Sequence, residues 1–225
     1  SNNYSDYQWS LMPQNIEIGG RNLLKGTSFA GALDTAWWNV RGTTYSLSID
    51  SSETFGGYNS LKIEGVDAGA SGRDVRVLTT MGNIDGTGGY AFRLSFYAKA
   101  SVPGRLDARW GYTSSDARNR VDLTTDWEHY VIDLHTDNMT ASHNYFYMVY
   151  NQAGTVWINR PKLEIGNTAT DWTPAPEDVD ANIDSAKNIS IEHTNEKVSE
   201  INATIGSITQ RVESTETNIT TINGI

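Results

Sequence analysis

This chain has no cysteine, little basic charge and no long apolar run. Without cysteine it has neither a disulfide framework nor thiolate chemistry. Lys and Arg total 17 against 27 Asp and Glu, which gives a net charge of -10. Nucleic acids and anionic membranes are both bound through clustered cations, so this balance argues against either partner. No stretch approaches the length of a transmembrane helix.

The chain is rich in aromatic residues, with seven Trp, eleven Tyr and five Phe. Hydrophobic residues make up 38% of the chain, enough for a core. A length of 225 residues fits one sizeable domain with an extension. The chain begins at Ser1, and a periodic apolar pattern runs up to its last residues. We therefore expect a piece of a longer protein.

That periodic pattern is a heptad stripe near the C-terminus. Its a positions are Ile191, Val198, Ile205, Val212 and Ile219, and its d positions are Thr194, Ile201, Ile208, Thr215 and Ile222. A single helix cannot bury such a stripe against itself, and isoleucine at both a and d favours three or four strands over two. The stripe predicts a parallel trimeric coiled coil. The alternative is one amphipathic helix that packs on its own domain.

The preceding region reads as all β. Short alternating segments are separated by Gly, Asn, Asp and Ser clusters, as in a β-sandwich. The expected strands are Thr43–Ile49, Ser60–Gly65, Asp74–Thr79, Tyr90–Ala100, Arg105–Tyr112, Arg120–Leu123, Trp127–Leu134, Asn144–Tyr150 and Val156–Glu164. This number of strands in one domain predicts a jelly roll.

These patterns predict a mainly β chain with four parts. Residues 1–19 form a lead-in, 20–166 the jelly roll, 167–179 a linker and 180–225 an α-helical coiled-coil stalk. The linker holds Pro174 and Pro176, which cannot continue a strand ladder or lie inside a helix. Carboxylates at 177, 178, 180 and 184 favour a helix N-terminus there.

Motifs for catalysis are scarce. The four histidines (His129, His135, His143 and His193) show no metal-ligand spacing, and no HExxH, GxSxG or P-loop occurs. The sequence GTGG at 86–89 is typical of a turn, and no helix pattern follows it as a phosphate-binding loop requires. We expect no catalytic residues, no metal site and no enzyme.

Alternation places aromatic and charged side chains on the outside of the sandwich. Tyr145 and Tyr147 alternate with apolar neighbours, and Asp107 and Arg109 do the same on another strand. Rings that stack on sugar faces, beside groups that bond hydroxyls, suit carbohydrate recognition. The alternative is that these rings only cover the sheet or cushion a neighbouring chain.

Several segments resemble carbohydrate-binding modules of the family 4/9 type, which are jelly rolls that bind glycans on a concave sheet. They are GRNLLKGTSF, AWWNV, SLKIEG, YAFRLSFYAKAS, LTTDWEHYVIDL and GTVWINRPKLEIG. The resemblance implies a groove lined by Trp37 or Trp38, Asp107, Arg109, Tyr145 and Tyr147. It also implies a structural calcium near an acidic pair in the last strand. This chain has Asn159 and Arg160 there, which argues against the calcium.

The stretch PKLEIGNTATDWTPAPEDVDANI is similar to the junction after such modules in tail, baseplate and receptor-binding proteins of phages that infect Gram-positive bacteria. The resemblance implies a non-catalytic virion protein that acts outside the host cell, at its surface. Its partners would be host cell-wall or surface polysaccharide, two further copies of the chain, and other tail proteins. Two alternatives are a structural spacer of the fibre and an accessory domain of a tail-associated wall hydrolase.

Overall fold

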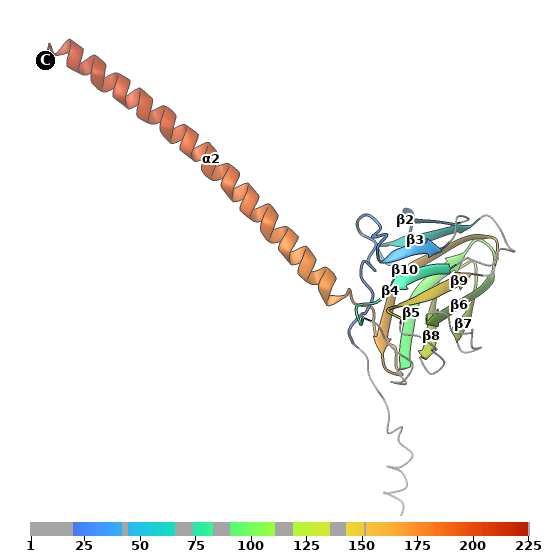
Figure 1. Cartoon of the computed structure of the whole chain (residues 1–225). Coiled ribbons are helices and arrows are strands. Elements are labelled where there is room, and N and C mark those ends of the chain that lie inside the picture. The colour runs from blue at the N-terminus through green and yellow to red at the C-terminus, as the bar shows by residue number, and fades with distance from the viewer. Residues whose placement is uncertain are drawn as a thin grey trace, which may run out of the picture. The chain divides into compact units, whose positions relative to one another are not determined.

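The computed structural model describes residues 20–41, 45–65, 74–82, 91–110, 119–135, 143–150 and 152–224. The predicted lead-in, the GTGG turn and the predicted strand ends at Thr43, Tyr90 and Tyr112 lie outside these residues. Within them, ten strands form two five-stranded antiparallel sheets, which pack face to face (Figure 1). This arrangement confirms the predicted β-sandwich.

The first sheet, here called the Tyr147 sheet, has the strand order β1-β4-β9-β6-β7. Its strands are β1 (Trp38–Arg41), β4 (Asp74–Leu78), β9 (Tyr145–Tyr150), β6 (Gly104–Trp110) and β7 (Arg120–Leu123). The second, here called the Tyr97 sheet, has the order β2-β3-β10-β5-β8. Its strands are β2 (Tyr45–Phe55), β3 (Tyr58–Gly65), β10 (Gly154–Ile165), β5 (Ala91–Ala100) and β8 (Glu128–His135).

Alternation within Tyr90–Ala100 predicts one apolar and one polar face, and the structure confirms this division in β5. In β5, Phe92, Leu94 and Phe96 are buried, whereas Arg93 and Tyr97 are only partly so. Two strand assignments need correction. The segment AWWNV contributes the short strand β1, which is paired with β4 and was not predicted. Strand β2 runs on to Phe55, beyond the predicted end, because its register with β3 shifts and pairing resumes.

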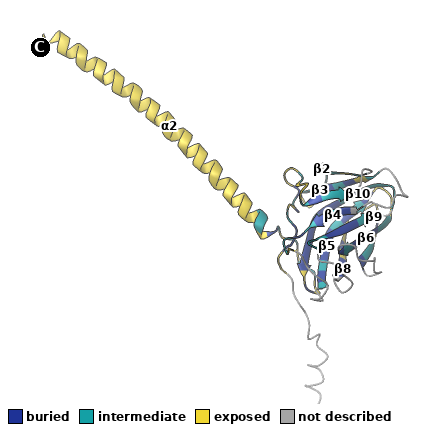
Figure 2. Cartoon of the chain, viewed as in Figure 1, coloured by how far each residue is buried: buried dark blue, intermediate teal, exposed yellow. Residues whose placement is uncertain are grey.

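A stack of three aromatic rings joins the two sheets through the core. Trp110 of β6 lies parallel to Phe92 of β5, with ring centroids 4.8 Å apart, and also faces Phe146 of β9 at 6.2 Å. All three are almost fully buried. Figure 2 shows in dark blue how buried residues are concentrated on the strands of the sandwich. Burial of each such ring stabilises the fold by about 2–3 kcal/mol. The sandwich therefore has one continuous core that fixes the outer faces of both sheets.

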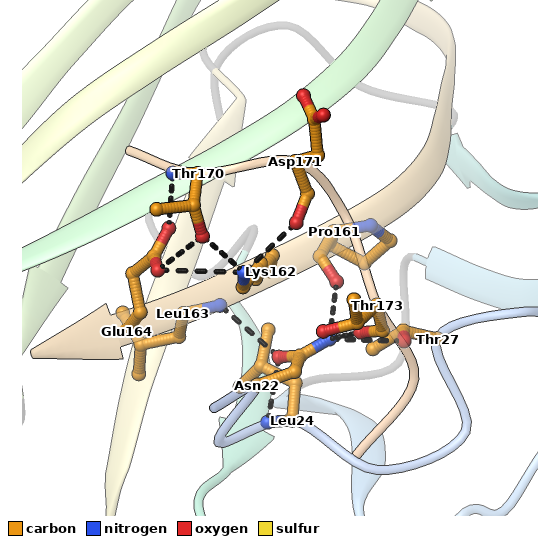
Figure 3. Close-up of polar contacts among 10 residues, drawn as sticks. All are labelled: Asn22, Leu24, Thr27, Pro161, Lys162, Leu163, Glu164, Thr170, Asp171 and Thr173. Atoms are coloured by element: carbon orange, nitrogen blue, oxygen red, sulfur yellow. Dashed lines mark hydrogen bonds and ion pairs between the residues drawn. The ribbon is translucent and has the colours of Figure 1, made fainter. Parts of the chain in front are cut away.

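The segment after β10 packs onto the sandwich through a buried side chain (Figure 3). Asn22 is fully buried, and its Nδ2 donates to the carbonyls of Pro161 (3.1 Å) and Thr173 (3.0 Å). Its Oδ1 accepts from the backbone N–H groups of Leu24 and Leu163. One amide thus ties the start of the domain, β10 and residues 167–175 together, so the first part of the predicted linker is fixed to the sandwich.

A buried ion pair fixes the same segment. Lys162 and Glu164 are at most 1% exposed, with their charged atoms 3.4 Å apart. The Lys162 ammonium also donates to Thr170 Oγ1 and to the Asp171 carbonyl, while Thr170 donates its N–H and its hydroxyl to Glu164. Figure 3 shows these bonds between β10 and the segment that covers it. Because every partner is hydrogen-bonded, the buried charges are compensated.

Helix α2 (Pro176–Ile222) begins inside the predicted linker. Pro176 takes the first helical position, where a missing N–H costs nothing, and Glu177 and Asp178 follow in the first turn. The chain divides into two units between Asp178 and Val179. No residue of α2 is buried, and the apolar residues of the heptad stripe are 50–82% exposed. In the described part of the chain, no helix has the length and apolarity that crossing a membrane requires.

Candidate functional site

Three neighbouring strands of the Tyr147 sheet present one row of side chains on its outer face. Tyr147 of β9 lies opposite Arg76 of β4 on one side and opposite Arg109 of β6 on the other. The residues before and after Tyr147, Phe146 and Met148, belong to the core. Strand alternation therefore directs all three members of the row away from the core.

Cations and aromatic rings alternate across this face. The Arg76 guanidinium lies 4.3 Å from the Tyr145 ring centre, and that of Arg109 lies 5.7 Å from the Tyr147 ring. The two tyrosines meet edge to face at 5.3 Å, and His143 contacts Tyr145 at 4.9 Å. Contacts of this kind hold flexible guanidinium groups in place before any ligand arrives.

At the β6–β7 edge of this face, the Asp107 carboxylate lies between two arginine side chains. Arg105 makes two contacts with its carboxylate, at 2.9 and 3.0 Å, and Arg120 approaches to 4.0 Å from β7. The Asp107 side chain is only 10% exposed, so it is held mainly by these arginines. Its chemical role in the structure is to fix two guanidinium groups.

The structure brings four of the six predicted site residues together: Asp107, Arg109, Tyr145 and Tyr147. The prediction for Trp38 is wrong, because its side chain is 1% exposed, packs edge-on against Phe29 and donates its indole N–H to the Lys25 carbonyl. Trp37 is half-buried beneath the Lys25 ammonium, which lies 4.8 Å from its ring. One strand, β4, lies between Trp37 and Tyr145, since the Trp37 carbonyl accepts from the Leu78 N–H and Leu78 pairs with Tyr145.

Sequence reasoning predicted Arg109 but missed the other arginines of this face, Arg76, Arg105 and Arg120. Among its outward positions with described side chains, four are arginine and two are aspartate: Arg76, Arg105, Arg109, Arg120, Asp107 and Asp122. The alternation of polar and apolar residues in DVRVL (β4) and GRLDARW (β6) could have placed Arg76 and Arg105 on the outer face. On a chain whose net charge is -10, this is a locally cationic surface.

The Tyr147 ring is buried, which limits the groups on this face that a ligand can contact. Its side chain is 2% exposed, so its ring is covered and cannot stack on a sugar in this conformation. Tyr145 is half-buried, and Arg76 lies over its ring. The Arg76 Nε is buried and has no hydrogen-bond acceptor among the described residues. The face is thus better built to donate hydrogen bonds from guanidinium groups than to offer open rings.

Asn159 and Arg160, where the register between β10 and β5 shifts, do not fit the structural calcium. Asn159 uses its amide nitrogen to donate to the carbonyls of Tyr58 and Asn59. Its Oδ1 accepts from the Arg160 side chain, which places a positive charge where a cation would bind. No group of three or more potential metal ligands of the His, Cys, Asp and Glu types exists among the described residues.

The same fold occurs in known carbohydrate-binding modules. The chain resembles the CBM22-1–CBM22-2 tandem domain of Xyn10C from Paenibacillus barcinonensis at a TM-score of 0.50 and 15% identity, over 68% of this chain and 48% of that one. The single xylan-binding CBM22-1 domain of that protein matches at 0.48 and 14%, over 68% of this chain and all of that one. No family model and no curated protein sequence matches the chain. The first similarity shows the fold of the sandwich.

Proposed function

We propose that this chain is a non-catalytic component of a phage tail fibre or baseplate that binds polysaccharide on the host surface or cell wall. Binding occurs on the outer face of the Tyr147 sheet, and a coiled coil formed by α2 multimerises the sites. The sequence similarity of residues 161–183 to junctions in phage tail proteins supports the setting. The carbohydrate-binding-module fold supports the ligand class.

The row Arg76–Tyr147–Arg109 carries this proposal, because it aligns two guanidinium groups across adjacent strands. A guanidinium group forms paired hydrogen bonds with carboxylate or phosphate oxygens. Two further arginines of the face, Arg105 and Arg120, lie next to Asp107 and add to its positive charge. The polysaccharide that fits best is therefore acidic, with uronate or phosphodiester groups along the chain.

Binding of purified acidic host polysaccharide, measured by calorimetry, tests the face. Loss of a charged hydrogen bond costs about 1.5–3 kcal/mol, so Arg76→Gln should weaken binding roughly tenfold or more. Lys62→Gln, which removes an equal charge from the opposite sheet, should leave binding unchanged. Added salt should weaken binding to the unaltered protein. Equal affinity of the unaltered protein and an Arg76→Gln/Arg109→Gln double variant would refute this site.

The exposed stripe of α2 supports multimerisation. Ile201, Ile205 and Ile208 are 52–57% exposed at consecutive a and d positions, and burying them between chains is what stabilises a coiled coil. Several copies on one stalk raise avidity without new contacts at any single site. Sedimentation equilibrium should show a trimer that dissociates in Ile201→Asn/Ile208→Asn. The control variant Ser207→Asp, which lies outside the stripe, should remain a trimer. If the unaltered protein is a monomer at all concentrations, the proposed coiled coil is refuted.

The buried ring of Tyr147 favours one other function, that of a structural spacer in the fibre. A face filled by its own side chains has less to offer a ligand. If the unaltered protein trimerises but binds no host polysaccharide, the spacer explains the structure better.

A further inference from the structure

The outer face of the other sheet carries a pocket that the proposed function does not use. It has a volume of about 330 Å³, at the lower end of the range for small-molecule sites. Its lining includes Ser95, Tyr97, His129, Arg160, Asp171 and Trp172. These residues come from three strands and from the segment that follows β10, all within the sandwich unit.

The floor of the pocket follows from strand register. Tyr97 of β5 lies opposite His129 of β8 on one side and opposite Asn159 of β10 on the other. The Tyr97 and His129 rings are 4.9 Å apart. Ladder pairing thus places an aromatic ring and an imidazole side by side, facing away from the core.

Arg160 enters the pocket from an unusual backbone conformation. Its φ is +47°, at the bulge where the register between β5 and β10 shifts. Its guanidinium lies 4.6 Å from the Tyr97 ring, 5.4 Å from Tyr58 and 5.6 Å from Phe55, and its Nε donates to Asn159. A strained non-glycine residue held by so many contacts is typical of a functional position.

The wall of the pocket is the segment 169–172. The Trp172 indole N–H donates to Thr27 Oγ1 at 3.1 Å, and its ring meets Tyr58 edge-on at 5.0 Å. Lys162 holds the Asp171 carbonyl, while Figure 3 shows the Asp171 carboxylate turned away from that buried network. Asp171 is exposed, so its carboxylate can accept hydrogen bonds from a ligand.

The charges in the pocket balance. Arg160 contributes one positive charge and Asp171 one negative charge. Loss of solvent around the ring and the nearby charge of Arg160 lower the pKa of His129 below its usual 6.5, against the opposing effect of Asp171, which favours the neutral imidazole. A ligand with a net charge gains little here, in contrast to the arginine-rich face of the Tyr147 sheet.

We propose that this pocket is a second carbohydrate site, which takes a neutral sugar unit with the Trp172 ring against its C–H face and Arg160 and Asp171 on its hydroxyl groups. A ring, a fixed donor and a fixed acceptor around a small concave space are the groups that a neutral polyhydroxylated ligand needs. The site is independent of the arginine face, and its test does not depend on the acidic polysaccharide.

Saturation-transfer NMR on the full chain tests the pocket. The probes are the methyl glycosides of glucose, galactose, mannose, xylose and N-acetylglucosamine, with methyl glucuronide as the charged comparison. We expect transfer to the C–H protons of at least one neutral glycoside in the millimolar range. Ala169→Leu, which fills the pocket, should abolish that transfer, and Asp171→Asn should weaken binding about tenfold. Exposed Asp126→Asn is the matched control and should bind as the unaltered protein does.

The outcomes separate this site from the arginine face. Transfer that persists in Arg76→Gln/Arg109→Gln supports the pocket even if that face binds nothing. Transfer that survives Ala169→Leu in a normally folded protein overturns the proposal, as does affinity that is unchanged in Asp171→Asn. Transfer to methyl glucuronide alone, or to no glycoside, also overturns it.

Discussion

Replacing Lys162 by Met should destabilise the sandwich far more than the same change at Lys62. Both lysines lie two residues before a glutamate on a strand of the Tyr97 sheet, and each contacts that glutamate, at 3.4 and 3.1 Å. They differ in burial, because the Lys162 side chain is 1% exposed and that of Lys62 is 27% exposed. The pair of substitutions therefore isolates the effect of burial on one kind of ion pair.

The expected loss in the free energy of unfolding depends on the hydrogen bonds that each glutamate keeps after its lysine is removed. Removing one partner of a buried pair costs about 3–5 kcal/mol. Glu164 keeps two hydrogen bonds from Thr170, so we expect the lower end, about 3 kcal/mol, for Lys162→Met. An exposed pair contributes at most about 1 kcal/mol, which bounds the effect of Lys62→Met. For a domain of this size, Lys162→Met should lower Tm by roughly 6–12 °C.

Urea unfolding followed by tryptophan fluorescence measures the difference, because α2 contains no tryptophan. Adding Glu164→Gln to Lys162→Met removes the uncompensated charge while keeping an acceptor for Thr170, and should recover part of the lost stability. Equal losses for the two single variants would show that burial does not govern this pair. A loss below about 1 kcal/mol for Lys162→Met would refute the reasoning.

Two further predictions concern the surroundings of Arg160. Because Arg160 lowers and Asp171 raises the pKa of His129, NMR titration should find that pKa higher in Arg160→Asn and lower in Asp171→Asn. The folded-state pKa lies below 6.5, so the unfolded chain binds more protons and stability should fall as pH drops through that value, less so in Arg160→Asn. Gly56→Ala and Gly57→Ala both strain a positive φ and should each cost about 1 kcal/mol. Only the first also brings a Cβ to 2.8 Å from the Arg160 guanidinium, so only it should disturb Tyr97 ring shifts in NMR spectra.

Local patterns sufficed for much of the sandwich. Alternation in β5 separated Phe92, Leu94 and Phe96 from Arg93 and Tyr97 without knowledge of the partner strands. It also placed Tyr145 and Tyr147 on the outer face. The same method did not reveal that Tyr147 would be covered, because burial of an outward residue depends on neighbours from other strands and loops. Trp37 and Trp38 could not be told apart, since β1 is too short for a period to be read.

The pocket lay beyond sequence reasoning for a different reason. It requires Trp172 to return beside Tyr97, which lies 75 residues earlier in the chain and pairs with a strand whose register shifts at Arg160. Local propensity gives no sign of a positive φ at arginine, although the following Pro161 is a residue that strand interiors accept mainly at bulges. The burial of Lys162 and Glu164 likewise depends on contacts from outside their own strand. Only the folded chain shows that residues 167–175 cover them.

The two proposed sites lie on opposite outer faces of one sandwich and differ in charge. Between them lies a core about 10 Å thick, so one short glycan cannot contact both. An acidic polymer on the arginine face should lose affinity as salt rises, whereas a neutral sugar in the Arg160 pocket should not. If α2 forms the proposed coiled coil, each copy on it would hold two different chains, or two parts of one branched chain. The avidity of such an assembly would depend on how charged and neutral units alternate in the polysaccharide, which is a selectivity that neither site has alone.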